Sequence, residues 1–340
     1  MKESQYESMF LKKSSLTPEE IRGLMRFAFY SNKLNNKIDF NLLVPKNWKF
    51  AELKEEQYIG GLVKRFIPEL NLNARIDVYR NFLIRECNPS EWIENELIAN
   101  GHEIILSKKS NSIVGIVSDL LTRRVLTNTT HIVRTTMVKD AAQLFRVECW
   151  ATEELYPHFA ESFLLALASF GLTFPQNIPV AEKLNNFSGL YPAIFTFKYP
   201  SSWTDRVETS SLNECKIKFE NVFENKNNGT LFINIAKARY KKTEKVLEDF
   251  FLQLNNEGYL LENYLTKLSD FTKGNQTNSS FDLIIKNRKG NPLEMRCNLV
   301  SEKDYSLLLG LISPLRESSP NWWSVNKRCF EIVRDSFVIS

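Results

Sequence analysis

Histidine and cysteine are the residues whose chemistry would be easiest to recognise in this sequence, and there are few of them. The chain has three histidines, His102, His131 and His158, and five scattered cysteines. No Cys-x-x-Cys occurs, and the histidines lie in different expected elements, so neither a metal site nor a metal cofactor is predicted. An odd number of scattered cysteines is typical of reduced thiols rather than of a disulfide framework.

One pair of these residues could perform nucleophilic chemistry. Cys149 lies in "LFRVECWA", on an expected strand, and His131 lies on the expected neighbouring strand. An imidazole beside a thiol can activate it as a nucleophile. The mixed pattern around Cys149 also fits a buried thiol that fills a core gap. No phosphate-binding loop, dinucleotide fingerprint or nucleophile elbow occurs, so no catalytic residue and no cofactor are assigned.

The composition limits the classes of partner. With 340 residues, of which 43% are hydrophobic and 12% aromatic, the chain can form two well-packed domains. A net charge of +4 is too small to predict a nucleic-acid partner. No apolar run reaches the ~18 residues of a membrane span. The N-terminus lacks the apolar core of a secretory signal, so a cytoplasmic protein is expected.

The same nine-residue frame occurs twice. "FNLLVPKNW" and "FTFKYPSSW" both read F-x4-P-x2-W, and later segments align at slightly larger offsets, as two colinear copies with small insertions would. The closing segments "SFLLALASFGL" and "CFEIVRDSFVI" also align. A repeat of this length predicts two whole domains rather than a solenoid. The structural positions that define the repeat are Phe40, Pro45, Trp48, Phe163 and Phe170 in the first copy, and Phe195, Pro200, Trp203, Phe330 and Phe337 in the second.

Each copy reads as three strands, a helix, three or four strands and a closing helix. Alternating apolar residues predict the strands, and glycines after apolar-periodic runs mark the ends of the central helices. In the first copy, after the opening frame, the expected elements are strands over 60–67 and 74–84, a helix from Asn88 to Gly101, strands over 103–107, 113–120, 131–139 and 143–151, and a helix over 162–172. In the second they are strands over 214–223 and 229–240, a helix from Thr243 to Gly258, strands over 259–267, 280–287, 292–300 and 304–313, and a helix over 329–339.

The predicted fold class is therefore α+β, with two tandem sandwiches of an antiparallel sheet and helices. Residues 1–35 form an N-terminal extension, in which a capping box at Thr17-Pro18-Glu19-Glu20 predicts a helix over about 17–32. No counterpart of this helix is expected in the second copy. The first domain is placed at 36–173, a proline-rich linker at 174–193, and the second domain at 194–340.

The element order, the F-x4-P-x2-W frame and the closing Ser-Phe together resemble the PsbP-like fold. That superfamily includes PsbP, the Ran-binding Mog proteins and the DcrB-like proteins, and the frames at Phe40–Trp48 and Phe195–Trp203 are most similar to the DcrB-like branch. The resemblance covers roughly 36–173 and 194–340. It implies a binding, assembly or chaperone role without catalysis, and some cytosolic DcrB-like members are adaptors for type VI secretion effectors. The tandem arrangement and the N-terminal helix depart from the single-domain pattern of the family.

The sequence favours a non-enzymatic protein-interaction module, an adaptor or chaperone built as a fused pseudo-dimer, with a protein partner. The candidate partner-binding residues are Trp322 and Trp323, because adjacent residues on a helix point about 100° apart and cannot both face one core. Packing within the second domain and contact with the neighbouring domain are the alternative roles for this pair. Two alternatives stay open: an enzyme with a cleft between its domains, centred on His131 and Cys149, and a secreted bacterial effector that binds a host protein. Neither the partner nor the oligomeric state can be read from the sequence.

Overall fold

The structure is a computed structural model that describes residues 2–32, 36–54, 61–70, 73–112, 115–238, 243–273, 276–301 and 304–340. The chain divides into two compact units. Unit 1 comprises Met1–Ile84 and Pro89–Ala181, and unit 2 comprises Arg85–Asn88 and Glu182–Ser340. Both consist of antiparallel sheets and helices, so the predicted α+β class is confirmed. The boundary at Ala181 falls inside the expected linker.

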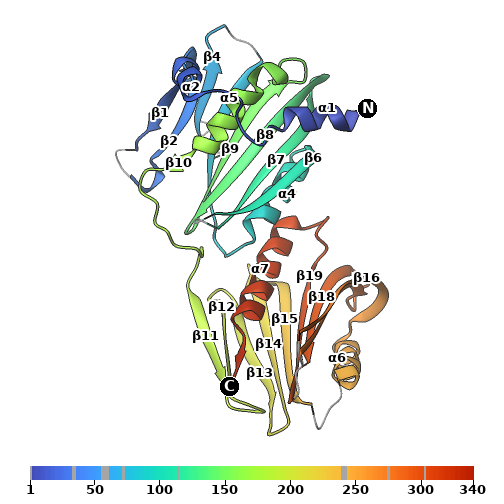
Figure 1. Cartoon of the computed structure of the whole chain (residues 1–340). Helices are drawn as coiled ribbons and strands as arrows, with labels where there is room; N and C mark the ends of the chain where they lie inside the picture. The colour runs from blue at the N-terminus through green and yellow to red at the C-terminus, as the bar shows by residue number, and fades with distance from the viewer. Residues whose placement is uncertain are drawn as a thin grey trace. The chain divides into compact units, whose positions relative to one another are not determined.

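Unit 1 is built on a seven-stranded antiparallel sheet in the order β3-β4-β5-β9-β8-β7-β6 (Figure 1). A three-stranded sheet, β1-β2-β10, lies in the same unit. The strands are β1 Met25–Tyr30, β2 Phe40–Pro45, β3 Trp48–Phe50, β4 Leu62–Pro68, β5 Ala74–Phe82, β6 Glu103–Ser112, β7 Gly115–Leu126, β8 Thr129–Asp140, β9 Gln143–Thr152 and β10 Gly171–Leu172. The helices are α1 Lys2–Met9, α2 Pro18–Leu24, α4 Pro89–Ala99 and α5 Tyr156–Ser169, with a 3-10 turn at Asn36–Ile38.

Unit 2 repeats this topology strand for strand. Its large sheet has the order β13-β14-β15-β19-β18-β17-β16, and its small sheet has the order β11-β12-β20. The strands are β11 Leu184–Gly189, β12 Phe195–Pro200, β13 Thr204–Ser210, β14 Glu214–Phe223, β15 Lys226–Lys237, β16 Leu260–Lys273, β17 Gln276–Lys286, β18 Pro292–Ser301, β19 Tyr305–Pro314 and β20 Val338–Ile339. Its helices are α6 Thr243–Glu257 and α7 Pro320–Ser336.

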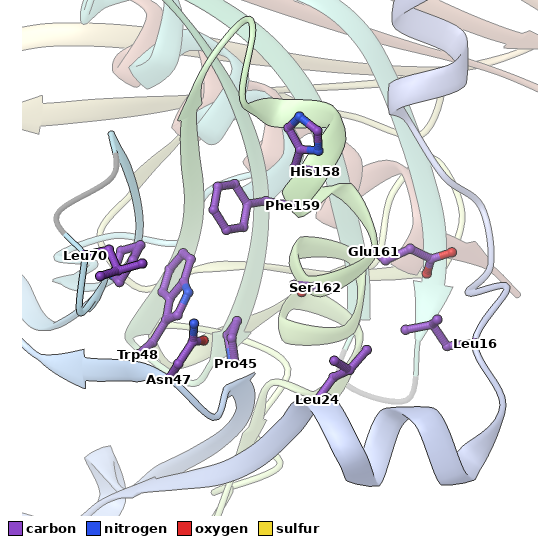
Figure 2. Close-up of a pocket in the computed structure, with 11 residues that line it drawn as sticks. Leu16, Leu24, Pro45, Asn47, Trp48, Leu70, His158, Phe159, Glu161 and Ser162 are labelled. Atoms are coloured by element: carbon purple, nitrogen blue, oxygen red, sulfur yellow. The ribbon is translucent and has the colours of Figure 1, made fainter.

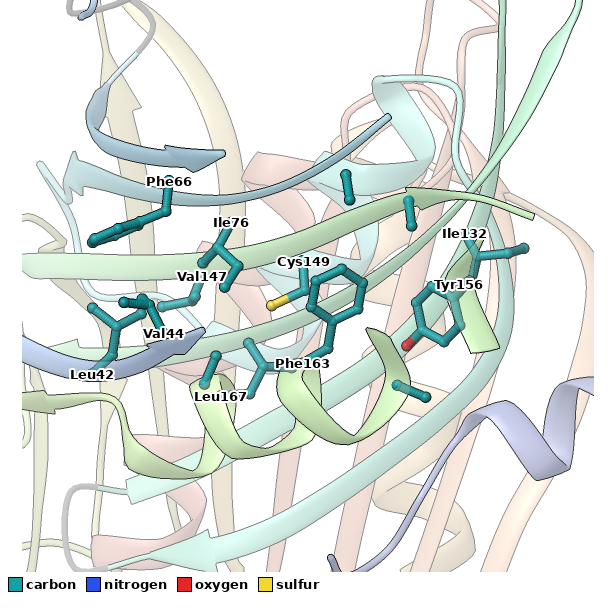
Figure 3. Close-up of a cluster of buried hydrophobic side chains, with 14 of the residues drawn as sticks. Leu42, Val44, Phe66, Ile76, Ile132, Val147, Cys149, Tyr156, Phe163 and Leu167 are labelled. Carbon is teal, nitrogen blue, oxygen red and sulfur yellow. The ribbon is translucent and has the colours of Figure 1, made fainter. Parts of the chain in front are cut away.

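The closing helix of each unit covers the main core. In unit 1, Phe163 and Leu167 of α5 pack toward Ile76, Val147 and Cys149 of the large sheet (Figure 3). In unit 2, Phe330 and Val333 of α7 occupy the equivalent core. A second cluster lies around the central helix of each unit: a small one at α4 and a larger one at α6. Apolar residues at helical spacing on these helices produce this arrangement.

The repeated residues have structural roles that the two copies share. The hydroxyl of Ser169 accepts a hydrogen bond from the Leu43 backbone N–H at 2.7 Å, and Ser336 accepts one from Lys198 N–H at 2.8 Å. The rings of Phe170 and Phe337 lie 5.5 and 5.7 Å from those of Phe40 and Phe195. Pro45 and Pro200 end the opening strands, and Trp48 and Trp203 are both 2% exposed.

The N-terminal helix predicted over 17–32 is wrong beyond its first two turns. The capping box forms and α2 begins at Pro18, but the helix ends at Leu24. Residues Met25–Tyr30 are instead strand β1, which pairs with β2. Aromatic residues in "MRFAFY" favour an extended chain, and pairing supplies partners for the edge of β2. This strand does have a counterpart, because β11, inside the expected linker, pairs with β12 in the same way.

Other element boundaries also differ. The closing helices end at Ser169 and Ser336, and Gly171–Leu172 and Val338–Ile339 pair as short strands with β2 and β12. The expected strands over 103–107 and 113–120 form a longer hairpin, β6–β7, because backbone pairing continues past the apolar residues that the pattern detects. Gly60, Ile113, Val114, Arg239 and Tyr240, which belong to expected strands, lie outside the described residues.

Candidate functional site

Unit 1 contains a pocket of about 310 Å³ beside the N-terminal half of α5. The pocket is bounded by the N-terminal segment, the turn between β2 and β3, the end of β4, and α5 (Figure 2). It is lined by Leu16, Leu24, Pro45, Asn47, Trp48, Pro68, Leu70, His158, Phe159, Glu161 and Ser162. This volume is at the lower end of the range for ligand pockets, so it suits one or two side chains rather than a large cofactor.

Local structure at the N-terminus positions one wall of the pocket. The Thr17 backbone N–H donates to Glu20 Oε2 at 2.7 Å, and Glu20 N–H donates back to Thr17 Oγ1 at 3.3 Å, which fixes the start of α2. At the other end of α2, the Lys46 N–H donates to the Leu24 carbonyl at 2.9 Å. The Leu24 side chain is held at the pocket with 56% of its surface exposed.

Aromatic and aliphatic side chains form the rest of the wall. Trp48 is buried, and its ring lies edge-on to Phe159 at 5.6 Å between centroids. Leu70, just after β4, is 82% exposed. The two exposed leucines and the tryptophan therefore give the pocket an apolar surface.

Glu161 supplies a charge to this apolar pocket. Its Oε1 accepts a hydrogen bond from Ser15 N–H at 2.9 Å and another from the Ser15 hydroxyl. Burial acts to raise the pKa of Glu161, but the hydrogen-bond donors of Ser15 and Ser14 outweigh it and hold that pKa below its ordinary value. The other oxygen, Oε2, is buried and accepts no hydrogen bond from the part of the chain that the structure describes.

The internal repeat allows this pocket to be located on unit 2. The offset of the opening frame places Ser202 where unit 1 has Asn47, and the register of β3–β4 and β13–β14 places Asn221 and Phe223 where it has Pro68 and Leu70. The offset of the closing helices places Arg328 where unit 1 has Glu161. The pocket of unit 1 can therefore be compared with the equivalent place on unit 2 residue by residue.

In unit 2 the equivalent place is filled by the residues Arg85–Asn88. The Arg85 guanidinium donates to Asn221 Oδ1 and, at 2.7 Å, to the Val222 carbonyl, and it lies 5.3 Å from the centre of the Phe223 ring. Glu86 Oε1 lies 3.1 Å from Arg328 Nε. Glu86 and Cys87 are buried. A short irregular segment therefore occupies in unit 2 the position that is an open pocket in unit 1.

The predicted pair of His131 and Cys149 does not form. Cys149 is opposite Arg134, and His131 is opposite Thr152, three residues from Cys149 on β9. Because side chains alternate between the faces of a strand, the imidazole and the thiol lie on opposite faces of the sheet. Burial also raises the pKa of the Cys149 thiol well above its ordinary value, which disfavours the nucleophilic thiolate. All five cysteines are buried.

The other face of the unit 1 sheet carries a buried charged cluster. Asp77 receives hydrogen bonds from Arg65 and Arg75, and Glu148 accepts one from Trp150 Nε1 at 2.9 Å. The Arg75 guanidinium lies 4.2 Å from the Trp150 ring centre. The offset of the opening frame places Phe232 of unit 2 at the position of Asp77, so an apolar core replaces this cluster in unit 2.

The histidines do not converge on one site. The His102 ring lies 5.3 Å from that of Trp150, and its Nδ1 is 2.9 Å from Thr122 Oγ1. Burial, together with the nearby Arg124 and Arg146, lowers the pKa of His102 to about 4, so it is neutral near pH 7. His158 lies apart, at the pocket. Among the residues in the described ranges, no three acidic, histidine or cysteine side chains are grouped to hold a metal ion.

The two candidate tryptophans differ in exposure. Trp323 is buried in unit 2, with the Arg316 guanidinium 4.7 Å from its ring centre. Trp322 is half-buried. Its ring centre lies 5.5 Å from that of Phe223 and 5.5 Å from the Arg85 guanidinium, so it borders the place on unit 2 that Arg85–Asn88 fills, which we call the filled seat. Partner binding by these two residues stays a prediction. No helix within the described part of the chain is long and apolar enough to span a membrane.

Sequence reasoning identified Pro45 and Trp48 as structural positions and did not find the other pocket residues. Leu16, Leu24 and Leu70 lie outside the repeated frame, and they converge only through tertiary structure. One signal was available. Glu161 and Arg328 occupy aligned positions in the two copies but carry opposite charges. A difference of this kind indicates that the two surfaces have diverged there.

No protein-family model matches the chain, and no curated protein matches it. Solved structures show distant similarity. The cyanobacterial PsbP protein CyanoP from Synechocystis sp. PCC 6803 is 12% identical over 43% of this chain and 92% of its own, with a TM-score of 0.35. LpqN of Mycobacterium tuberculosis, involved in cell envelope biogenesis, is 9% identical over 46% and 96%, with a TM-score of 0.34. The immunity protein TplEi of T6SS from Pseudomonas aeruginosa is 12% identical over 86% and 97%, with a TM-score of 0.23.

Similarity this distant carries no argument about activity or partners. A PsbP protein is among the structures that resemble part of this chain. The DcrB-like branch stays a prediction.

Proposed function

We propose that this chain is a non-enzymatic protein-interaction module that receives an extended peptide segment of a protein partner in the pocket of unit 1. A module of this kind serves as an adaptor or a chaperone. The observation that carries the proposal is the filled seat of unit 2, where Arg85–Asn88 occupies the position equivalent to the pocket. The duplicated architecture thus already binds a short irregular segment of protein chain at this place.

The surface of the pocket supports the same function. Leu24 and Leu70 are both more than half exposed, and Trp48 and Phe159 line the same pocket. Burial of an exposed leucine side chain stabilises a complex by about 1.5–3 kcal/mol. Beyond Leu24, the chain enters β1, an edge strand whose Phe27 and Phe29 are also exposed. An apolar surface of this kind favours a protein partner over a small polar ligand.

Selection of a random peptide display library on the full chain tests the proposal. The dissociation constants of enriched peptides are then measured on the wild type, on Leu24→Asp and on Leu252→Asp. Leu24 is 56% exposed at the pocket, and Leu252, on α6 in unit 2, is 59% exposed, so the second variant is a matched control for an added surface charge.

The expected result is a set of peptides that bind Leu24→Asp at least about tenfold more weakly than the wild type, since one buried leucine is lost and a charge is placed in an apolar contact. Their affinity for Leu252→Asp is unchanged. Failure to enrich any peptide, or peptides that bind Leu24→Asp as tightly as the wild type, would overturn the proposed function.

A further inference from the structure

From the differences between the pocket of unit 1 and the filled seat of unit 2, we infer that the partner segment carries an apolar residue followed directly by a lysine or arginine. This inference rests on the proposed function, and it names the chemistry of the ligand. The two sites share a position in the duplicated fold, so Arg85–Asn88 of unit 2 can serve as a template for the partner segment. Where the lining of the unit 1 pocket differs from that of unit 2, the partner residue must differ from the template residue.

The first position of the template is Arg85. In unit 2 its guanidinium is satisfied by the Asn221 side chain and the Val222 carbonyl, and it lies beside the rings of Phe223 and Trp322. Arg85 is half-buried, and a guanidinium that is partly removed from water is stabilised by such partners.

The unit 1 counterparts change the character of this subsite. Pro68 stands at the place of Asn221, Leu70 at the place of Phe223, and Leu155 at the place of Trp322. Neither the proline ring nor the leucine side chains can accept a hydrogen bond. An arginine here would lose the side-chain acceptor that it has in unit 2, whereas an aliphatic or aromatic side chain would bury against Leu70 and Trp48. The first residue of the partner pair is therefore apolar.

The second position of the template is Glu86. Its buried carboxylate pairs with Arg328 of α7 at 3.1 Å. The counterpart of Arg328 on α5 is Glu161, so the sign of the charge at this subsite is inverted. An acidic residue from the partner would meet a like charge, and a basic residue would meet an opposite one.

The state of Glu161 fits a cationic ligand. Its hydrogen bonds from Ser15 keep the carboxylate ionised, and they involve only Oε1. Glu161 lines the pocket, while its Oε2 is buried and accepts no hydrogen bond from the described residues. The carboxylate therefore acts on a ligand through its charge, and an ammonium or guanidinium group compensates that charge, which makes the second residue of the pair lysine or arginine.

The test uses the peptides enriched on the full-length protein. Their sequences are expected to share an apolar residue followed by lysine or arginine. A representative peptide and a version with its basic residue changed to glutamate are then titrated against the wild type, Glu161→Gln and Glu161→Arg. Glu161→Gln retains an acceptor for Ser15 while it removes the charge, and melting curves verify that both variants are folded.

We expect Glu161→Gln to weaken the basic peptide about three- to tenfold and to leave the glutamate peptide little changed. Glu161→Arg should reverse the preference, so that the glutamate peptide binds more tightly than the basic one. Peptides that depend on Leu24 but show no basic residue and no response at Glu161 would overturn this inference and leave the proposed function standing. Absence of any Leu24-dependent peptide would remove both.

Discussion

The carboxylate of Asp77 provides a direct test of how the charged face of unit 1 is held together. Its two oxygens accept hydrogen bonds from Arg65 at 2.6 and 2.7 Å and from Arg75 at 2.9 Å, and the side chain is fully buried. The substitution Asp77→Asn keeps the size of the side chain, removes its charge and turns an amide donor toward a guanidinium. Removal of one partner from a buried ion pair costs about 3–5 kcal/mol. Because asparagine retains one acceptor, we expect a loss of about 3 kcal/mol in the free energy of unfolding.

The assay is urea unfolding followed by circular dichroism, with Glu103→Gln as the control. Glu103 pairs with Arg123 on the surface of the same sheet, and their side chains are 63% and 35% exposed. An exposed pair of this kind contributes less than about 1 kcal/mol. Equal losses for the two variants would refute the argument, since they would mean that burial does not strengthen the Asp77 interactions.

Three further predictions follow from the hydrogen bonds, pKa values and burial described above. Ser169→Ala leaves the Leu43 N–H without its acceptor and should lower the free energy of unfolding by about 1–2 kcal/mol, whereas Ser318→Ala, at an exposed site, should change it little; chemical denaturation distinguishes the two. His102 has a folded pKa of about 4, below its unfolded value near 6.5, so the unfolded chain binds more protons between these values. The free energy of unfolding should therefore be highest above pH 6.5 and fall as the pH drops toward 4. The fall should be shallower in His102→Asn, and a steeper fall in that variant would contradict this assignment. All five cysteines are buried, so a thiol reagent should label the folded protein slowly and the protein in denaturant at once, and rapid labelling of the folded form would show that a thiol is reachable.

Much of the architecture could be predicted from the sequence because the same pattern of strands and helices occurs in both copies. Phe40 and Phe195 begin equivalent strands, and Ser169 and Ser336 end equivalent helices. Alternation of apolar residues gives the strand faces, and glycine after a helical run gives the helix ends. These are local signals, and they led to the α+β class and the order of the main elements.

Pairing between distant segments could not be predicted in the same way. The strands β1 and β11 lie in segments interpreted as a helix and a linker, and their conformation is decided by the unpaired edges of β2 and β12. Backbone groups at a strand edge need partners, but a sequence pattern does not say which segment provides them.

The sequence by itself determined a duplicated α+β chain without a recognisable catalytic motif. Only the tertiary structure decided which residues come together. It placed the side chains of His131 and Cys149 on opposite faces of the sheet. His131 is paired with Thr152, and side chains three residues apart on β9 point to opposite faces. It also filled the seat of unit 2 with Arg85–Asn88 and left the equivalent place on unit 1 as a pocket, a difference that depends on which distant segment can bury its side chains there.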